Sequence, residues 1–218
     1  HQWSREVFSF ALALQNLMWG ATQPFAGWLA DRFGARRVLW SASVLYALGL
    51  IGMAYSTTGT GMAATAGLMI GAAQSGCTYS VVFAAIGRLV PDEKRGWSMG
   101  VVAAAGSFGQ FLMIPVASGL IGGMGWFGTL LIFAAGALLI IPLGGALTKG
   151  LAAGAAGIGQ TAREALGEAM TEKSFVLLIA GYFVCGFQVV FIGVHFPSYL
   201  IDKGMGANTG MTALALIC

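Results

Sequence analysis

Charged side chains are scarce in this chain and are missing from most of its length. Asp, Glu, Lys and Arg make up 9% of the 218 residues, whereas soluble domains carry about 25%. They are also clustered, so that charge-free runs cover residues 7–30, 38–87, 96–148 and 174–201, and another begins at residue 204. A soluble fold would have to bury nearly all of these runs. We therefore exclude a soluble protein and predict an integral protein of the lipid bilayer.

The chain has only three cysteines, and its apolar runs hold no cluster of acids, bases or metal ligands. Cys77, Cys185 and Cys218 all lie within apolar runs, and their spacing fits neither a disulfide framework nor a metal site. Acids, bases and metal ligands do not cluster at one depth of any run, which argues against a membrane-embedded enzyme. The basic residues form no stripe with aromatic partners, so nucleic acid is not a predicted partner. We predict no metal and no cofactor.

The lengths of the charge-free runs predict the number of membrane helices. One helix needs about 20 apolar residues to cross the hydrocarbon core, and backbone groups in lipid must bond internally, which favours helices. Two runs hold one helix each, and the two long runs hold two each, divided at residues 56–60 and 122–125. The predicted fold is all-α, a polytopic bundle with six full transmembrane helices and the start of a seventh. The full helices are expected at residues 7–30, 38–55, 62–89, 97–121, 126–147 and 175–198.

Glycine, in contrast, is abundant, with 34 residues. Small residues let membrane helices approach one another closely, because no side chain separates their backbones. Gly67, Gly71 and Ser75 are spaced four residues apart and therefore share one face of a helix. We predict that this face packs tightly against a neighbouring helix.

Basic residues are unevenly divided between the two ends of these helices. Nine lie on one side, and Arg5 and Lys203 lie on the other. The side with the excess is predicted to be cytoplasmic. The long segment 148–174 is then cytoplasmic, with a Gly/Ala-rich linker at 150–159 and a short helix expected at 161–170. The nine are Arg32, Arg36, Arg37, Arg88, Lys94, Arg95, Lys149, Arg163 and Lys173.

The charged loop after the first helix carries the most specific motif. Its pattern is Gly, three residues, Asp, a basic residue, one residue, Gly, one residue and two basic residues, filled here by Gly27, Asp31, Arg32, Gly34, Arg36 and Arg37. It resembles the loop between the second and third membrane helices of the major facilitator superfamily. The resemblance implies a twelve-helix carrier, of which this chain holds the second helix to the start of the eighth. Residues 1–147 would be the N-terminal half bundle without its first helix, 148–174 the interdomain loop, and 175–218 the start of the C-terminal half bundle.

In that family the motif has a gating role. The resemblance implies that Asp31 contacts the positive N-terminus of a helix in the other half and stabilises the outward-open state. Gly27 and Gly34 would permit the close approach and the tight turn that this contact needs. Arg95, in a segment that resembles the loop between helices four and five, is assigned to the same cytoplasmic side. The alternative is a basic loop that only fixes topology.

Polar side chains inside the spans mark the predicted substrate cavity, because a polar group in lipid is costly. Asp, Glu, Lys and Arg do not lie deep within any span, so amides, hydroxyls and one histidine are the candidates. Each amide could instead join two helices, and His195 could face the headgroups rather than couple protons. The predicted cavity residues are Asn16, Gln23, Gln74, Thr78, Tyr79, Gln110, Gln188 and His195.

Short segments in two helices indicate a subclass. Residues 106–110, 186–188 and 195–197 resemble the bacterial branch related to monocarboxylate and oxalate–formate carriers, and the arginine and Gly-Pro pairing typical of drug exporters are absent. The resemblance implies alternating access, transport of small organic anions by proton symport or exchange, a monomeric functional unit and a bacterial inner membrane. A drug or metabolite exporter of the same superfamily is the alternative, and a non-transporting membrane sensor is a more distant one.

Overall fold

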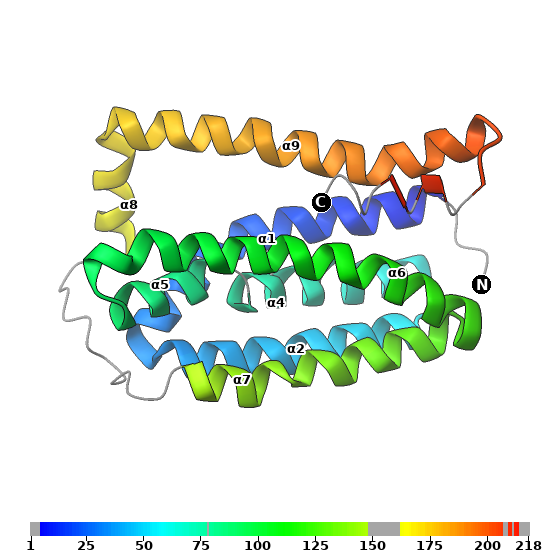
Figure 1. Cartoon of the computed structure of the whole chain (residues 1–218), viewed down its shortest axis with the longest axis horizontal. Coiled ribbons are helices and arrows are strands. Elements are labelled where there is room, and N and C mark those ends of the chain that lie inside the picture. Colours follow the sequence, from blue (N-terminus) through cyan, green and yellow to red (C-terminus); the bar gives the residue numbers. More distant parts are fainter. Residues whose placement is uncertain (1–4, 78, 148–161, 207–208, 211, 214–218) are drawn as a thin grey trace. The chain divides into compact units, whose positions relative to one another are not determined.

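The computed structural model describes residues 5–77, 79–147, 162–206, 209–210 and 212–213, and every regular element in them is a helix (Figure 1). The predicted all-α class is confirmed for this part of the chain. Thr78, Cys218 and the linker 150–159 lie outside the described residues. The chain divides into a first unit, residues 1–103 with 120–157, and a second unit, residues 104–119 with 158–218.

The first unit begins with two long helices that a single glycine joins. These are α1 (Arg5–Phe33) and α2 (Ala35–Tyr55). Gly34 between them has a φ of 90° and a ψ of 140°, a conformation that suits a residue without a Cβ. The predicted helices at 7–30 and 38–55 are therefore present, and both extend a few residues further toward the charged loop.

The predicted helix at 62–89 is divided into consecutive segments rather than being one uniform α-helix. The π-helix η1 follows the short helix α3, and its wider turns interrupt the regular helical spacing. Two α-helical segments then complete the span. The segments are α3 (Gly59–Met62), η1 (Ala63–Met69), α4 (Ile70–Cys77) and α5 (Tyr79–Leu89).

Helix α6 (Asp92–Leu138) contains a sharp break at Gly125. This residue has a φ of 72° and a ψ of 179°, and it lies at the end of the predicted 122–125 turn. The Tyr55 and Phe127 rings lie 5.1 Å apart, and Trp40 Nε1 donates a hydrogen bond to the Ile141 carbonyl at 2.8 Å. Because Tyr55 ends α2 and Trp40 lies near its start, residues 126–141 run antiparallel to α2, as Figure 1 shows.

A second interruption separates α6 from α7 (Ile140–Leu147) at Leu139. Pro142 has no N–H, so the helical hydrogen bond to the Leu138 carbonyl cannot form. Fully buried Ser43 of α2 donates to the Ala137 carbonyl at 2.7 Å, just before the interruption. Trp40 reaches the Ile141 carbonyl just after it, so α2 supplies a side-chain donor on each side.

Small residues form the closest helix contacts of the first unit. A Cβ added at Gly71 would lie 2.6 Å from the carbonyl oxygen of Gln15 in α1, and one at Gly67 would lie 2.8 Å from Leu14 Cδ2. A Cβ added at Gly76 would lie 2.6 Å from Ala42 Cβ in α2. The predicted packing face at Gly67 and Gly71 is therefore confirmed, and it packs against α1. Around these contacts the core contains mainly alanine, valine and leucine.

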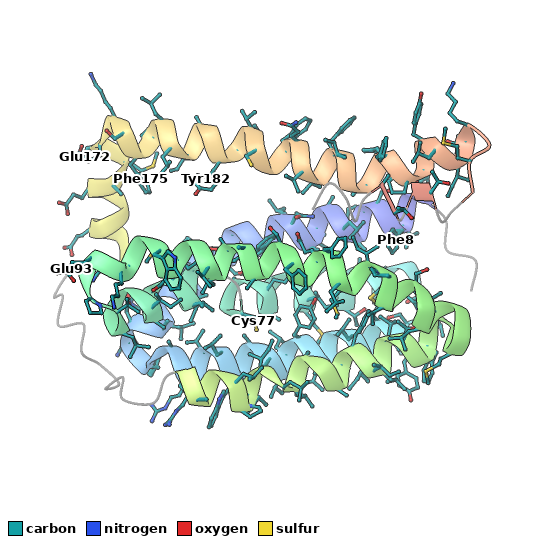
Figure 2. All side chains as sticks on the ribbon, viewed as in Figure 1. Phe8, Cys77, Glu93, Glu172, Phe175 and Tyr182 are labelled. Atoms are coloured by element: carbon teal, nitrogen blue, oxygen red, sulfur yellow. The ribbon has the colours of Figure 1, made fainter. Side chains whose placement is uncertain are left out.

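The second unit contains α8 (Ala162–Thr171), α9 (Lys173–Asp202) and residues 104–119 of α6. The predicted short helix at 161–170 and the long helix at 175–198 are both present. Most described side chains of α9 are exposed, including Phe175 and Tyr182, which project from the helix (Figure 2). An apolar and exposed surface is expected of a helix whose sides contact lipid or further membrane helices.

Within the described residues, four helical stretches are long and apolar enough to cross a membrane. One of them is 55 residues long and is broken at Gly125, so that it is long enough for two crossings. Helix α1, with 29 residues, is long enough to cross but is less apolar, because it carries Gln15, Asn16 and Gln23. The four stretches are Ala35–Tyr55, Gly59–Gly87, Asp92–Ala146 and Lys173–Asp202.

Replacing Gly125 by alanine is expected to destabilise the protein by about 1–3 kcal/mol, because its backbone conformation is almost exclusive to glycine. Thermal unfolding of the purified full-length protein in detergent would measure the change. Gly123→Ala is the matched control, since Gly123 has helical φ and a Cβ there would meet nothing within 4 Å among the described residues. Equal melting temperatures for the two variants would contradict the prediction.

Candidate functional site

Two glutamine side chains meet between α1 and α4. Gln15 Nε2 donates a hydrogen bond to Gln74 Oε1 at 3.1 Å, and both residues are half-buried. The bond joins positions 59 residues apart in the sequence. Gln74 is a predicted cavity residue, whereas Gln15 is not. In surroundings of low polarity such a bond fixes the orientation of both amides.

The amide pair has donors that its mutual hydrogen bond does not use. A glutamine amide carries two N–H donors and one carbonyl acceptor. The bond occupies one N–H of Gln15 and one lone pair of Gln74 Oε1, and it involves neither N–H of Gln74. These N–H groups suit a carboxylate oxygen, because hydrogen bonds to a charged acceptor are stronger than those between neutral groups.

The close approach of α1 and α4 positions this pair. Gly71 lies one turn before Gln74, and a Cβ there would lie 2.6 Å from the Gln15 carbonyl oxygen and 2.9 Å from Met18 Cβ. Only glycine therefore leaves room for the α1 backbone at this point. The π-helix η1 immediately precedes α4, and π-helical turns are frequent at functional sites.

The other cavity residues predicted in the first unit have different surroundings. The half-buried Asn16 donates through Nδ2 to the Leu12 carbonyl of its own helix at 2.9 Å. Gln23 is also half-buried and has an interaction partner. Tyr79 is exposed, with its ring 5.3 Å from the Phe83 ring. Thr78 lies outside the described residues.

The cavity residues predicted in the second unit are exposed. This holds for Gln110 in α6 and for Gln188 and His195 in α9. The His195 ring lies 4.8 Å from the Phe191 ring, which is one turn earlier on the same helix. A cavity role for these three residues stays a prediction.

In the charged loop, arginines lie over aromatic rings. The guanidinium carbon of Arg32 lies 5.4 Å from the centre of the Trp28 ring, and that of Arg36 lies 5.3 Å from the centre of the Trp40 ring. The exposed Asp31 has an interaction partner. These contacts place the loop's charge at the ends of α1 and α2, beside aromatic side chains.

The two motif glycines have different surroundings. The positive φ of Gly34 confirms the tight turn predicted there. A Cβ added at Gly27 would meet nothing within 4 Å among the described residues, so the close approach predicted at Gly27 stays a prediction. The gating contact of this loop likewise remains an expectation.

Arg95 lies near the start of α6, beside the end of α5. It forms an ion pair with Asp92, three residues earlier. Its Nε is buried without a hydrogen-bond partner among the described residues, although the side chain as a whole is 42% exposed. A Cβ added at Gly87 would lie 3.8 Å from this Nε, so the side chain packs against the end of α5.

The sequence of the whole chain, residues 1–218, matches the family model described as Major Facilitator Superfamily. The chain belongs to this superfamily. It is 29% identical over 216 residues to monocarboxylate transporter 11 of Mus musculus, and the aligned region covers 96% of this chain and 46% of that protein. It is 26% identical over 215 residues to monocarboxylate transporter 11 of Homo sapiens, and the aligned region covers 96% of this chain and 44% of that protein. The chain thus spans about half the length of these relatives.

Membership in the Major Facilitator Superfamily confirms the predicted family and fold. The chain therefore belongs to a superfamily of multi-pass integral membrane proteins whose members transport small-molecule substrates. Both of these relatives are mammalian.

Gln15 is a residue of the candidate site that the sequence did not predict. It directly precedes Asn16, and helical spacing places it on a different face from the predicted cavity residues Asn16 and Gln23. The available signal was the small-residue face at Gly67 and Gly71, because such a face requires a close neighbour. A polar residue on that neighbour would then be within reach of Gln74.

Proposed function

We propose that this chain is part of a secondary active carrier for small organic anions of the monocarboxylate class, moved by alternating access with proton symport or by exchange. The observation that carries the proposal is the similarity, over 96% of the chain, to two proteins named monocarboxylate transporter 11. The resemblance of residues 106–110, 186–188 and 195–197 to bacterial carriers of small carboxylates supports it independently.

The amide pair is the proposed anchor of the substrate site. Gln15 orients Gln74, and the N–H groups of Gln74 donate to a carboxylate oxygen of the substrate. A monocarboxylate needs few partners, so neutral donors in low-polarity surroundings contribute substantially to its binding. The same proposal assigns further substrate contacts to Asn16, Gln23, Thr78, Tyr79, Gln110 and Gln188, and proton coupling to His195.

The remaining parts of the proposal concern gating and topology. Asp31 with Gly27, Gly34 and the loop arginines forms the cytoplasmic gate, together with Arg95. Residues 148–174 are the cytoplasmic loop between two half bundles, and the functional unit is a monomer in a bacterial inner membrane. The basic residues that gather on one side of the spans support this orientation.

Transport by the full-length protein in proteoliposomes tests the proposal. Uptake of radiolabelled lactate or pyruvate should be saturable, and an inward proton gradient should raise it several-fold if protons are co-transported. Stimulation by unlabelled monocarboxylate inside the vesicles, without a gradient, would instead identify exchange. Dicarboxylates should compete poorly. An absence of monocarboxylate flux in protein that is folded and inserted would overturn the proposal.

One observation favours a second candidate, an exporter of amphipathic compounds. The central parts of the predicted spans contain no Asp, Glu, Lys or Arg. A cavity lined by uncharged side chains suits hydrophobic substrates. The same vesicles would distinguish the two functions. Extrusion of an amphipathic dye, with no flux of lactate or pyruvate, would identify the exporter.

A further inference from the structure

The indole of Trp40 is fixed in place at the surface of the first unit. Its Nε1 donates to the Ile141 carbonyl at 2.8 Å, and a Cβ added at Gly145 in α7 would lie 3.5 Å from Trp40 Cζ2. The side chain is nevertheless 39% exposed. Contacts with α7 therefore hold an aromatic ring whose remaining surface faces outward.

Arg36 lies over this fixed ring, with its guanidinium carbon 5.3 Å from the ring centre. A guanidinium held over an aromatic face keeps its N–H donors available at its edges, and these donors match the oxygens of a phosphate in pairs. Because the ring is already held, placing the guanidinium costs little side-chain entropy when an anion binds.

A similar arrangement occurs four residues earlier. Arg32 lies 5.4 Å from the Trp28 ring centre and 5.6 Å from the Phe33 ring centre, and both aromatic side chains are 41% exposed. Asp31, Arg32, Arg36 and Arg37 together carry a net charge of +2, three arginines against one aspartate. This short stretch therefore combines positive charge with exposed aromatic rings.

We propose that Arg36 and Trp40, with Arg32 and Trp28 beside them, bind the phosphate of an anionic phospholipid headgroup. The loop lies where two apolar helices of a membrane protein end, and Trp is enriched at this depth of a bilayer. Anionic lipids bind basic pockets at the ends of membrane helices. The exposed rings favour a lipid over a free phosphate, because they can contact the glycerol and upper acyl region while the arginines hold the phosphate.

Native mass spectrometry of the full-length protein, purified in detergent and titrated with phosphatidylglycerol or phosphatidylcholine, tests the proposal. The unmodified protein should retain phosphatidylglycerol in preference to phosphatidylcholine. Arg36→Gln should weaken phosphatidylglycerol binding by roughly tenfold, because it removes a charge-assisted pair of hydrogen bonds. Arg36→Lys keeps the charge but not the paired donors, so it should lose a measurable part of the binding.

The matched control is Lys94→Gln, which removes one exposed positive charge near the start of α6. It should leave phosphatidylglycerol binding unchanged. Equal losses for Lys94→Gln and Arg36→Gln would overturn the proposal, because general charge attraction would then explain the binding. Displacement of the lipid by soluble glycerol phosphate at similar concentration would also overturn it, since the site would then recognise phosphate without the lipid.

Discussion

Replacing Gly71 by leucine is expected to prevent α1 and α4 from packing and to leave little folded protein. The added Cβ would lie 2.6 Å from the Gln15 carbonyl oxygen and 2.9 Å from Met18 Cβ. A backbone carbonyl cannot turn aside as the end of a flexible side chain can, so the two helices would have to separate. Overpacking alone costs about 1–3 kcal/mol, and loss of the helix contact adds to it. The yield and melting temperature of monodisperse full-length protein would measure the effect.

Two further variants separate this clash from a general effect of losing glycine. Gly71→Ala adds only the Cβ and should give an intermediate loss. Gly100→Leu in α6 is the control, because a Cβ at Gly100 would meet nothing within 4 Å among the described residues. A Gly71→Leu protein that is as stable as the Gly100→Leu protein would show that Gly71 of α4 does not lie against the Gln15 carbonyl of α1.

The placement of the helices could be predicted from the charge pattern, together with the uncharged turns at 56–60 and 122–125 that divide the two long runs. Lipid excludes charge, so each charge-free run ends where the chain reaches the membrane surface. The helix expected at 175–198 is observed at 173–202, and the one expected at 7–30 is observed at 5–33. The charge pattern could not locate the π-helix at 63–69 or the interruption at Leu139. The interruption follows from Pro142, which carries no charge, and a tertiary contact accompanies it, the hydrogen bond from the Ser43 hydroxyl to the Ala137 carbonyl.

The candidate site could be predicted only in part, because helical spacing gives the face of a residue but not the helix opposite it. Gln74 was identified as a polar residue within a span, and its hydrogen-bond partner Gln15 was not. Asn16 is also a predicted cavity residue, yet its amide donates a hydrogen bond to the Leu12 carbonyl of its own helix. The face that α1 presents to α4 is set by close packing against Gly71, which is a property of two helices together.

Substituting the two amides, singly and together, is expected to show that the pair acts in transport and not only in packing. Gln15→Met or Gln74→Met leaves one half-buried amide without its partner, at a cost of about 1–3 kcal/mol in apolar surroundings. The double variant removes both amides at nearly unchanged volume, so its stability should recover most of that loss. Transport of monocarboxylate should fall at least about tenfold in Gln74→Met and should not recover in the double variant.

Thermal unfolding and transport must be measured on the same full-length preparations, because the two readouts distinguish the two roles of the pair. A hydrogen bond that only joins membrane helices contributes about 0.6 kcal/mol of stability on average. Removing such a bond would leave the transport rate per folded molecule unchanged. Asn16→Leu is a useful comparison, since the Asn16 amide donates to the Leu12 carbonyl of its own helix. Recovery of transport together with stability in the double variant would contradict a substrate role for Gln74. Loss of transport in a double variant that is as stable as the parent protein would place the Gln74 amide in contact with the transported anion.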